Sequence, residues 1–133
     1  MKLCANLSFM FTEEESLEQR YRLAQEAGFR YVECAFPYSE DKERLRRVLE
    51  ETGLTQVLIN TVPGDSLGHG ARPGEEAVFR ANMATALEYC SAMGATKLHI
   101  MAGKRMPWVD RNMALETFKQ NIRYEQDIIF GTD

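Results

Sequence analysis

Residues Ala27-Gly28-Phe29-Arg30-Tyr31-Val32-Glu33 join the end of a predicted helix to the start of a predicted strand. The same order of helix end, glycine, short linker and strand recurs at Thr52-Gly53-Leu54-Thr55-Gln56-Val57-Leu58 and at Met93-Gly94-Ala95-Thr96-Lys97-Leu98-His99. Glycine suits the left-handed residue just beyond a helix, where a Cβ would be strained. Repetition of this order is typical of a parallel sheet with crossover helices. The sequence therefore predicts an α/β fold.

The spacing of apolar residues predicts four strands and four helices in strict alternation. The strands are predicted at residues 3–9, 31–36, 56–61 and 98–102. The helices are predicted at residues 16–27, 40–52, 75–93 and 113–128, with Ser16 and Ser39 as N-caps of the first two. By length we expect one domain over residues 1–133, with a Gly/Pro-rich loop at 62–74 on the active-site side.

Charge, hydropathy and cysteine content indicate which kinds of binding partner and which cellular compartment to expect. A net charge of −4 disfavours nucleic acid or an anionic membrane as the main partner. No run approaches the roughly 18 apolar residues of a membrane helix. Three dispersed cysteines, Cys4, Cys34 and Cys90, form no CxxC pair and indicate reduced, mostly buried thiols. We therefore expect a cytoplasmic protein.

Each predicted strand has one apolar face and one face that carries a polar group. Alternation places polar side chains on the second face at four positions, with Gln56 also on that face of the third strand. The four are Asn6, Glu33, Asn60 and His99. A sheet covered by helices on both sides would not favour these groups, whereas the lumen of a (β/α)8 TIM barrel opens onto its active site. The sequence predicts a TIM-barrel type of which this chain carries about four βα units.

Some of these polar groups have both a structural and a functional interpretation. Glu33 lies early in its strand and is interpreted as a buried ion-pair partner, either of Lys97 or of a residue that this chain does not contain. Asn6 and Asn60 lie nearer the strand ends, where loops form a site, and His99 precedes the glycine that lets a ligand approach the backbone. His69, in the glycine-rich loop, and Trp108 are possible loop contacts, but each is also explained by packing. No self-sufficient catalytic motif, such as GxSxG or HExxH, is present.

Several short motifs arrive in an order that is similar to a known family. They are Ala5-Asn6-Leu7-Ser8, Phe36-Pro37-Tyr38, Leu58-Ile59-Asn60-Thr61, Pro63-Gly64-Asp65, His99-Ile100-Met101-Ala102-Gly103 and Asn121-Ile122-Arg123-Tyr124. The chain resembles hydroxypyruvate isomerase, of the xylose-isomerase-like group of TIM barrels, from about residue 2 to residue 124. Residues 125–133 leave the family pattern and form a divergent tail. The resemblance implies interconversion of hydroxypyruvate and 2-hydroxy-3-oxopropanoate (tartronate semialdehyde) by proton transfer between adjacent carbons.

The resemblance also implies that substrate-binding residues and catalytic residues lie on different strands of the barrel. We expect Asn6, Phe36, Asn60 and His99 to line the pocket of a small hydroxy-carbonyl acid. The catalytic glutamates and the ligands of a divalent metal, Mg²⁺ or Mn²⁺, are expected on later strands, so this chain holds no catalytic residue and no metal by itself. We expect the chain to be an N-terminal half-barrel, inactive alone, whose exposed sheet edges favour a homodimer.

Other functions stay open on the same residues. The chain could be an inactive truncated half-barrel that binds a partner or dimerises, or a related sugar isomerase or epimerase, since a fold does not determine the chemistry. An abasic-site endonuclease would need a basic surface stripe, and the acidic balance argues against it.

Overall fold

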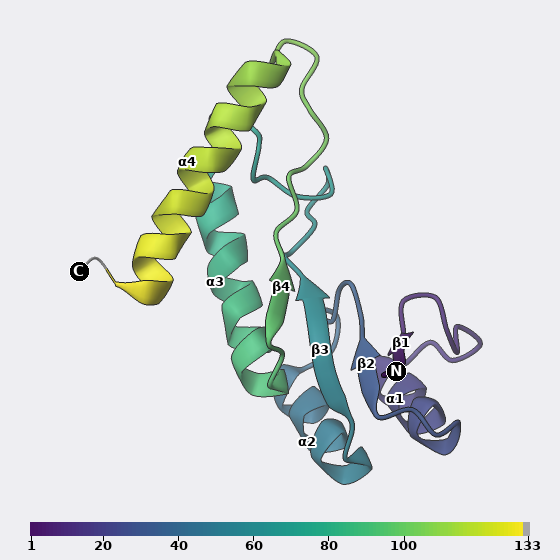
Figure 1. Ribbon diagram of the computed structural model, residues 1–133. Helices are drawn as coiled ribbons and strands as arrows, with labels where there is room; N and C mark the ends of the chain where they lie inside the picture. The colour runs from purple at the N-terminus through teal and green to yellow at the C-terminus, as the bar shows by residue number, and fades with distance from the viewer. Residues whose placement is uncertain (132–133) are drawn as a thin grey trace. The chain divides into compact units, whose positions relative to one another are not determined.

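The computed structural model describes residues 1–131, and the last two residues of the predicted tail lie outside the described residues. Strands and helices alternate as predicted (Figure 1). They are β1 (Cys4–Asn6), α1 (Leu17–Glu26), β2 (Tyr31–Glu33), α2 (Lys42–Thr52), β3 (Thr55–Asn60), α3 (Glu76–Met93), β4 (Lys97–His99) and α4 (Arg111–Phe130). Three of the four strands are shorter than predicted, because the pairing stops before the apolar run does.

The four strands form one parallel sheet in the order β1-β2-β3-β4. Neighbours in the sequence are neighbours in the sheet, so every crossover turns in the same sense. This consecutive order is that of a (β/α) barrel, whereas a doubly wound sheet reverses its order at a switch point. The prediction of an α/β fold with four consecutive βα units is confirmed.

The chain divides into two compact units. The first contains residues 1–61 and 85–99, and the second contains residues 62–84 together with the described residues from Ile100 onward. The whole sheet, α1, α2 and the C-terminal part of α3 belong to the first unit. The N-terminal part of α3, the loop at 62–74 and α4 belong to the second.

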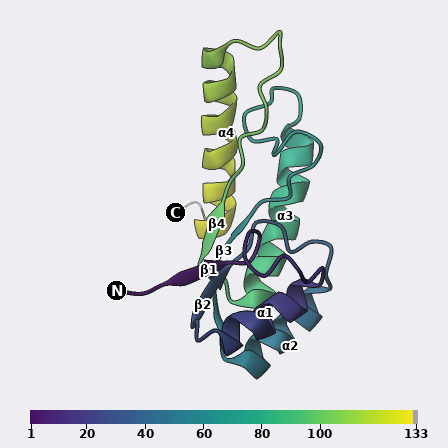
Figure 2. The ribbon, with the colours of Figure 1, turned by 90° about the vertical axis from the view of Figure 1, so that its right-hand side faces the viewer.

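The core of the first unit lies between one face of the sheet and helices α1 and α2. Strand residues such as Val32 and Ile59 pack with Tyr21 of α1 and with Leu45 and Val48 of α2, and all five are at most 1% exposed. Figure 2 shows α1 and α2 together beside the strands. The buried apolar residues of these two helices therefore face the sheet. The opposite face of the sheet carries the polar residues.

A β-bulge in β3 corrects the predicted position of Gln56. Val32 pairs with Gln56 but Glu33 pairs with Leu58, so Val57 is an extra residue in β3. The extra residue reverses the alternation before it, and Gln56 lies in the core, 1% exposed, instead of on the polar face. The Tyr21 hydroxyl donates to Gln56 Oε1 at 2.5 Å, which satisfies the buried amide.

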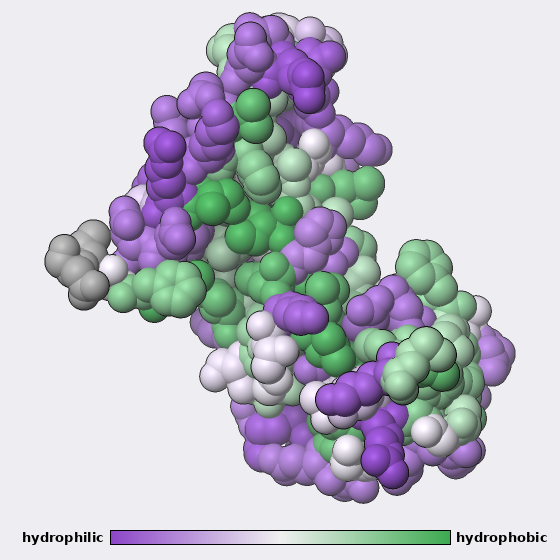
Figure 3. All heavy atoms as spheres, viewed as in Figure 1, coloured by the Kyte–Doolittle hydropathy of each residue, from purple (hydrophilic) through white to green (hydrophobic). Residues whose placement is uncertain are grey.

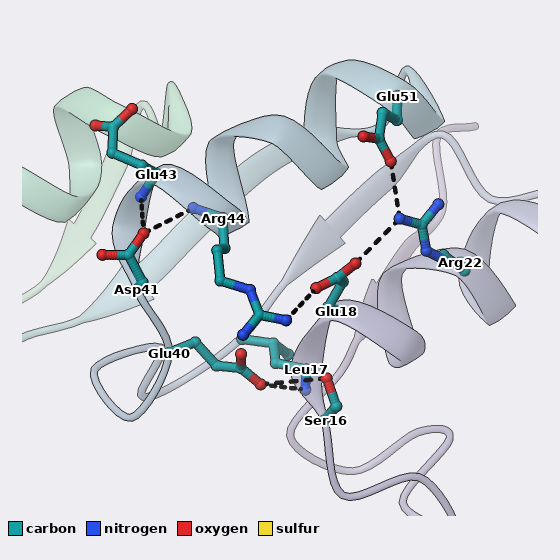
Figure 4. A network of polar contacts seen from close by, with 9 residues as sticks. All are labelled: Ser16, Leu17, Glu18, Arg22, Glu40, Asp41, Glu43, Arg44 and Glu51. Atoms are coloured by element: carbon teal, nitrogen blue, oxygen red, sulfur yellow. Dashed lines mark hydrogen bonds and ion pairs between the residues drawn. The ribbon is translucent and has the colours of Figure 1, made fainter.

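The helix starts correct the prediction for Ser39. Asp41 is the N-cap of α2, and its side chain accepts from the backbone N–H groups of Glu43 and Arg44 at 3.1 and 3.0 Å. Ser16 does occupy the N-cap position of α1, but its side chain makes no capping hydrogen bond, and Glu40 accepts from the Leu17 N–H at 2.9 Å. Figure 4 shows both starts. At both helix starts a carboxylate accepts the backbone hydrogen bond, because a helix N-terminus favours negative charge.

The cysteine prediction is only partly confirmed. All three thiols are free, as expected, but only Cys34 is buried, whereas Cys90 is half-buried and Cys4 is exposed. Cys4 lies on the outermost strand of the sheet, on the face that no helix of the first unit covers. None of the described helices is long and apolar enough to cross a membrane.

Candidate functional site

The polar face of the sheet carries two hydrogen-bonded side-chain pairs, each bridging neighbouring strands. Asn6 of β1 donates from Nδ2 to Glu33 Oε1 of β2 at 2.9 Å. His99 of β4 places Nδ1 3.2 Å from Asn60 Oδ1 of β3. The partner found for the Glu33 carboxylate is thus an amide rather than the predicted Lys97. Three of the four predicted pocket residues therefore lie on one face, as two bridges between strands.

The orientation of Asn6 is set at both ends of its amide. Its Oδ1 accepts from the Ser8 N–H at 3.0 Å, while Nδ2 donates to Glu33. Ser8 in turn accepts from the Ala35 N–H at 2.7 Å, which connects the chain beyond β1 to the chain beyond β2. One N–H of the Asn6 amide is left for another acceptor, since a primary amide has two. The network holds the carboxyl ends of β1 and β2 in a single geometry.

Tyr38, which was not predicted as a site residue, contacts the backbone of Asn60 in the Asn60–His99 pair. Its hydroxyl donates to the backbone carbonyl of Asn60. Its ring packs edge-to-face on Tyr89, with centroids 5.0 Å apart, and the Tyr89 hydroxyl donates to the Glu40 carbonyl at 2.8 Å. Burial raises the pKa of Tyr38, so its hydroxyl stays protonated. The only sequence signal for this role is its place directly after Phe36-Pro37.

A pocket of about 220 Å³ opens at the carboxyl ends of β1 and β2. Phe36, 39% exposed, lines it together with Ser8 and Arg20. Arg20 donates to the backbone carbonyls of Leu7 and Glu14 at 2.9 and 2.7 Å and so fixes the loop between β1 and α1. Binding sites of parallel α/β proteins lie at this end of the strands. The fourth predicted pocket residue, Phe36, therefore lies where a site is expected.

The predicted loop contacts belong to the second unit. His69 is buried, with Nδ1 2.6 Å from Glu75 Oε2, and a Cβ added to Gly64 would lie 2.3 Å from its Nε2. The Arg72 guanidinium donates to both carboxylate oxygens of Glu75, from Nε to Oε2 at 2.6 Å and from Nη2 to Oε1 at 2.9 Å. Trp108 is 78% exposed. The His69 ring thus has a structural partner in Glu75 and lies close to Gly64, whereas the indole of Trp108 is available to solvent.

The loop at 62–74 is more ordered than its composition suggests. Gly68 forms an antiparallel bridge with Ala102, and the Ala71 N–H donates to the Ala102 carbonyl at 2.8 Å. The side chain of Asn121, from α4, donates to the Gly70 carbonyl at 2.9 Å. Long-range hydrogen bonds therefore replace the secondary structure that the loop lacks.

The carboxylate at the base of this loop makes stability depend on pH. Arg72, and after it His69, lower the pKa of Glu75 to about 2. The ionised form is favoured in the folded chain, so this stabilisation is complete above pH 4.5 and is lost as the pH falls toward 2. We expect Glu75→Gln to lower the free energy of unfolding by about 1 kcal/mol at pH 7, since solvent screens part of the interaction.

Urea unfolding of the two proteins at pH 7 and pH 3 measures this dependence. The difference between wild type and Glu75→Gln should shrink at pH 3. Glu116→Gln, which removes an exposed pair with Lys119, is the control and should show a smaller difference at pH 7. A Glu75→Gln effect of equal size at both pH values would contradict the assignment to the ionised carboxylate.

The described residues do not form a metal centre. Among residues 1–131, no three side chains of His, Cys, Asp or Glu gather so that they could hold a metal ion. On the polar face, Glu33 and His99 belong to separate pairs on different strands.

Comparison with known proteins identifies the kind of molecule that this site belongs to. The profile of a family described as "Xylose isomerase-like TIM barrel" matches residues 21–128. A "Putative hydroxypyruvate isomerase" of Danio rerio is 42% identical over 97% of this chain and 50% of its own length. The protein of the same name from Homo sapiens is 39% identical over 100% of this chain and 51% of its own. The chain spans about half the length of the curated relatives it matches.

Two further similar proteins carry other names. A "2-oxo-tetronate isomerase" of Cupriavidus necator is 39% identical over 92% of this chain and 48% of its own. A solved structure titled "AP endonuclease, family 2" from Brucella melitensis is 41% identical, with a TM-score of 0.89 over 98% of this chain and 53% of that one. The four βα units of this chain therefore correspond to half of a larger fold.

Proposed function

The chain belongs to the xylose isomerase-like TIM-barrel family, with isomerases among its relatives, and from that premise we propose that it is the substrate-binding half of a hydroxypyruvate isomerase. The reaction interconverts hydroxypyruvate and tartronate semialdehyde by moving a proton between adjacent carbons. The observation that carries the proposal is the pair of cross-strand bridges, Asn6–Glu33 and Asn60–His99, on one face of the sheet. They present amide and imidazole groups of the kind that bind hydroxyl and carbonyl oxygens.

The bridge between Asn60 and His99 defines what His99 offers to a ligand. Asn60 Oδ1 can only accept, so His99 Nδ1 carries the proton in this pair. In the neutral imidazole Nε2 then has a free lone pair, which accepts a hydrogen bond from a substrate hydroxyl. Asn6 has a remaining N–H that donates to a carbonyl oxygen. These groups bind and orient a hydroxy-carbonyl compound, which brings its reacting carbons into place.

The acid–base step is assigned to residues outside this chain. Isomerisation needs a base that removes a proton next to a carbonyl and a group that stabilises the developing enediolate. We assign the carboxylates, and a divalent metal such as Mg²⁺ or Mn²⁺, to the half of the barrel that this chain does not match in its relatives. The free thiols support a reducing compartment, which we propose to be the cytoplasm.

Fragment complementation tests the proposal. The 133-residue chain is assayed on hydroxypyruvate with Mg²⁺ or Mn²⁺, alone and after co-folding with the half of the Danio rerio relative that it does not match. We expect no turnover from the chain alone and measurable turnover from the co-folded pair. In that pair, His99→Ala and Asn6→Ala should each lower kcat/KM roughly tenfold, the cost of one lost hydrogen bond to substrate.

Arg46→Ala, on the exposed face of α2, is the matched control and should leave kcat/KM unchanged. Turnover by the chain alone would contradict the assignment of the carboxylates. Unchanged kinetics in both site variants would contradict the proposed binding face.

The relatives named 2-oxo-tetronate isomerase support a second substrate on the same chemistry. The ratio of kcat/KM values for hydroxypyruvate and 2-oxo-tetronate in the co-folded pair decides between them. Endonuclease activity is disfavoured by the net charge of −4, because a DNA-binding face needs a basic patch.

A further inference from the structure

The carboxyl end of β3 is held in place by the segment between β2 and α2. The Asn60 N–H donates to the Ala35 carbonyl at 2.9 Å, and the Tyr38 hydroxyl donates to the Asn60 carbonyl. The next N–H of the chain, that of Thr61, donates to the His99 carbonyl of β4 at 2.9 Å. The backbone of Asn60 is therefore fixed through both of its polar groups, at the residue whose side chain reaches His99.

The ring of Tyr38 is itself held by Tyr89 of α3. The two rings pack edge-to-face, and the Tyr89 hydroxyl donates to the carbonyl of Glu40, which lies two residues after Tyr38. Tyr89 thus positions the Tyr38 ring and is anchored on the same segment that carries it. Burial raises the pKa of Tyr38, so its hydroxyl remains protonated and able to donate. A firmly held donor therefore faces the carbonyl of Asn60.

The Asn60–His99 pair lies on the open face of the sheet. Figure 3 shows hydrophilic side chains at the surface over β3 and β4, in the same view as Figure 1. His99 is exposed, and its Nδ1 lies 3.2 Å from Asn60 Oδ1. Water competes for such a hydrogen bond, so the bond persists only if its two ends are held in position.

We propose that Tyr38 is a positioning residue for His99. By holding the carbonyl of Asn60, it keeps the Asn60 amide oxygen facing Nδ1 and so determines which nitrogen of the imidazole carries the proton. The inference rests on the proposed function, in which Nε2 of His99 accepts a hydrogen bond from a substrate hydroxyl. With the proton on Nε2 instead, this nitrogen would be a donor and could not accept from that hydroxyl. Tyr38 thus affects substrate binding through Asn60 and His99 rather than by contact with the substrate.

The nitrogen chemical shifts of His99 test this role without an enzyme assay. Protonated and unprotonated imidazole nitrogens have well-separated shifts, so proton–nitrogen correlation spectra of the neutral ring identify the tautomer. We expect the wild-type chain to carry the proton of His99 on Nδ1. In Tyr38→Phe the two nitrogen shifts should move toward each other, because the ring then samples both tautomers. His69, the other histidine of the chain, is an internal reference whose shifts should stay unchanged.

Tyr31→Phe is the matched control, because it also removes one tyrosine hydroxyl. Tyr31 lies at the start of β2, at the opposite end of that strand from the segment that carries Tyr38. Its substitution should leave both nitrogen shifts of His99 unchanged.

Tyr89→Phe keeps the Tyr38 hydroxyl but removes the anchor on Glu40. It should move the His99 shifts in the same direction as Tyr38→Phe, by a smaller amount. If Tyr38→Phe does not fold, changed His99 shifts in Tyr89→Phe support the proposal and unchanged shifts overturn it.

Kinetics of the co-folded pair give the second measurement. Tyr38→Phe should lower kcat/KM roughly two- to tenfold, the range that corresponds to one hydrogen bond, whereas Tyr31→Phe should not. A wild-type His99 with its proton on Nε2, or wild-type shifts of His99 in a folded Tyr38→Phe, overturns the positioning role. Changed shifts with unchanged kinetics support the positioning of His99 and contradict its proposed part in substrate binding, so the two failures are distinguishable.

Discussion

Gly68→Ala is expected to destabilise the second unit by about 2–4 kcal/mol. Gly68 has a φ of +112°, and an added Cβ would lie 2.3 Å from the Met101 carbonyl oxygen. The clash is with backbone, so no side-chain rotation relieves it. The strained dihedral costs about 1 kcal/mol, and forcing the two backbone segments apart adds a further 1–3 kcal/mol. The bridge from Gly68 to Ala102 would open as a result.

Gly74→Ala is the matched control for this substitution. Gly74 lies in the same loop with a φ of +85°, but an added Cβ would meet no atom within 4 Å. It should therefore cost only the dihedral term, about 1 kcal/mol. Urea unfolding measures both variants, and amide exchange at Ala71 reports the loop directly. Equal losses would show that backbone conformation alone, and not the close approach of the two segments, requires glycine at position 68.

Tyr21→Phe is expected to lower the free energy of unfolding by about 2 kcal/mol. The Tyr21 hydroxyl is the donor to Gln56 Oε1, and both side chains are at most 1% exposed. Burial raises the pKa of Tyr21 well above 10, so the hydroxyl remains a donor at all ordinary pH values. Removing it leaves a buried amide oxygen without this partner, which costs about 1–3 kcal/mol.

A double-mutant cycle separates this hydrogen bond from packing. Gln56→Leu leaves the Tyr21 hydroxyl without its acceptor, whereas Tyr21→Phe with Gln56→Leu removes both polar groups. The double variant should be more stable than the sum of the single effects predicts, by about 1 kcal/mol or more. Additive losses in thermal or urea unfolding would contradict a direct coupling between the two side chains.

The polar face of the sheet could be predicted because its residues follow simple alternation. Asn6, Glu33, Asn60 and His99 alternate with apolar neighbours that the core requires. Which of them bond to one another was not predictable, because the partners depend on strand register. Asn6 reaches Glu33 across β1 and β2, and Asn60 reaches His99 across β3 and β4.

The predictions for the N-cap of α2 and for the position of Gln56 were wrong because the sequence offers no signal that decides them. Ser39 and Asp41 are both good N-cap residues, and the sequence alone does not say which one precedes the first helical turn. The extra residue Val57 has no marker in the sequence, because it is a β-branched residue inside an apolar strand. Its effect on Gln56 appears only when β3 is paired with β2.

The order of the elements, the parallel sheet and the apolar faces of α1 and α2 can be predicted from the sequence without a structure. These follow from glycine conformation and from periodicities of 3.6 and 2 residues, which act over a few neighbours in the chain. The bulge at Val57, the partner of Glu33 and the anchoring of the loop at 62–74 become known only once the chain is folded. These depend on hydrogen bonds between residues far apart in the sequence, and buried polar groups take whichever partner the folded chain brings within reach.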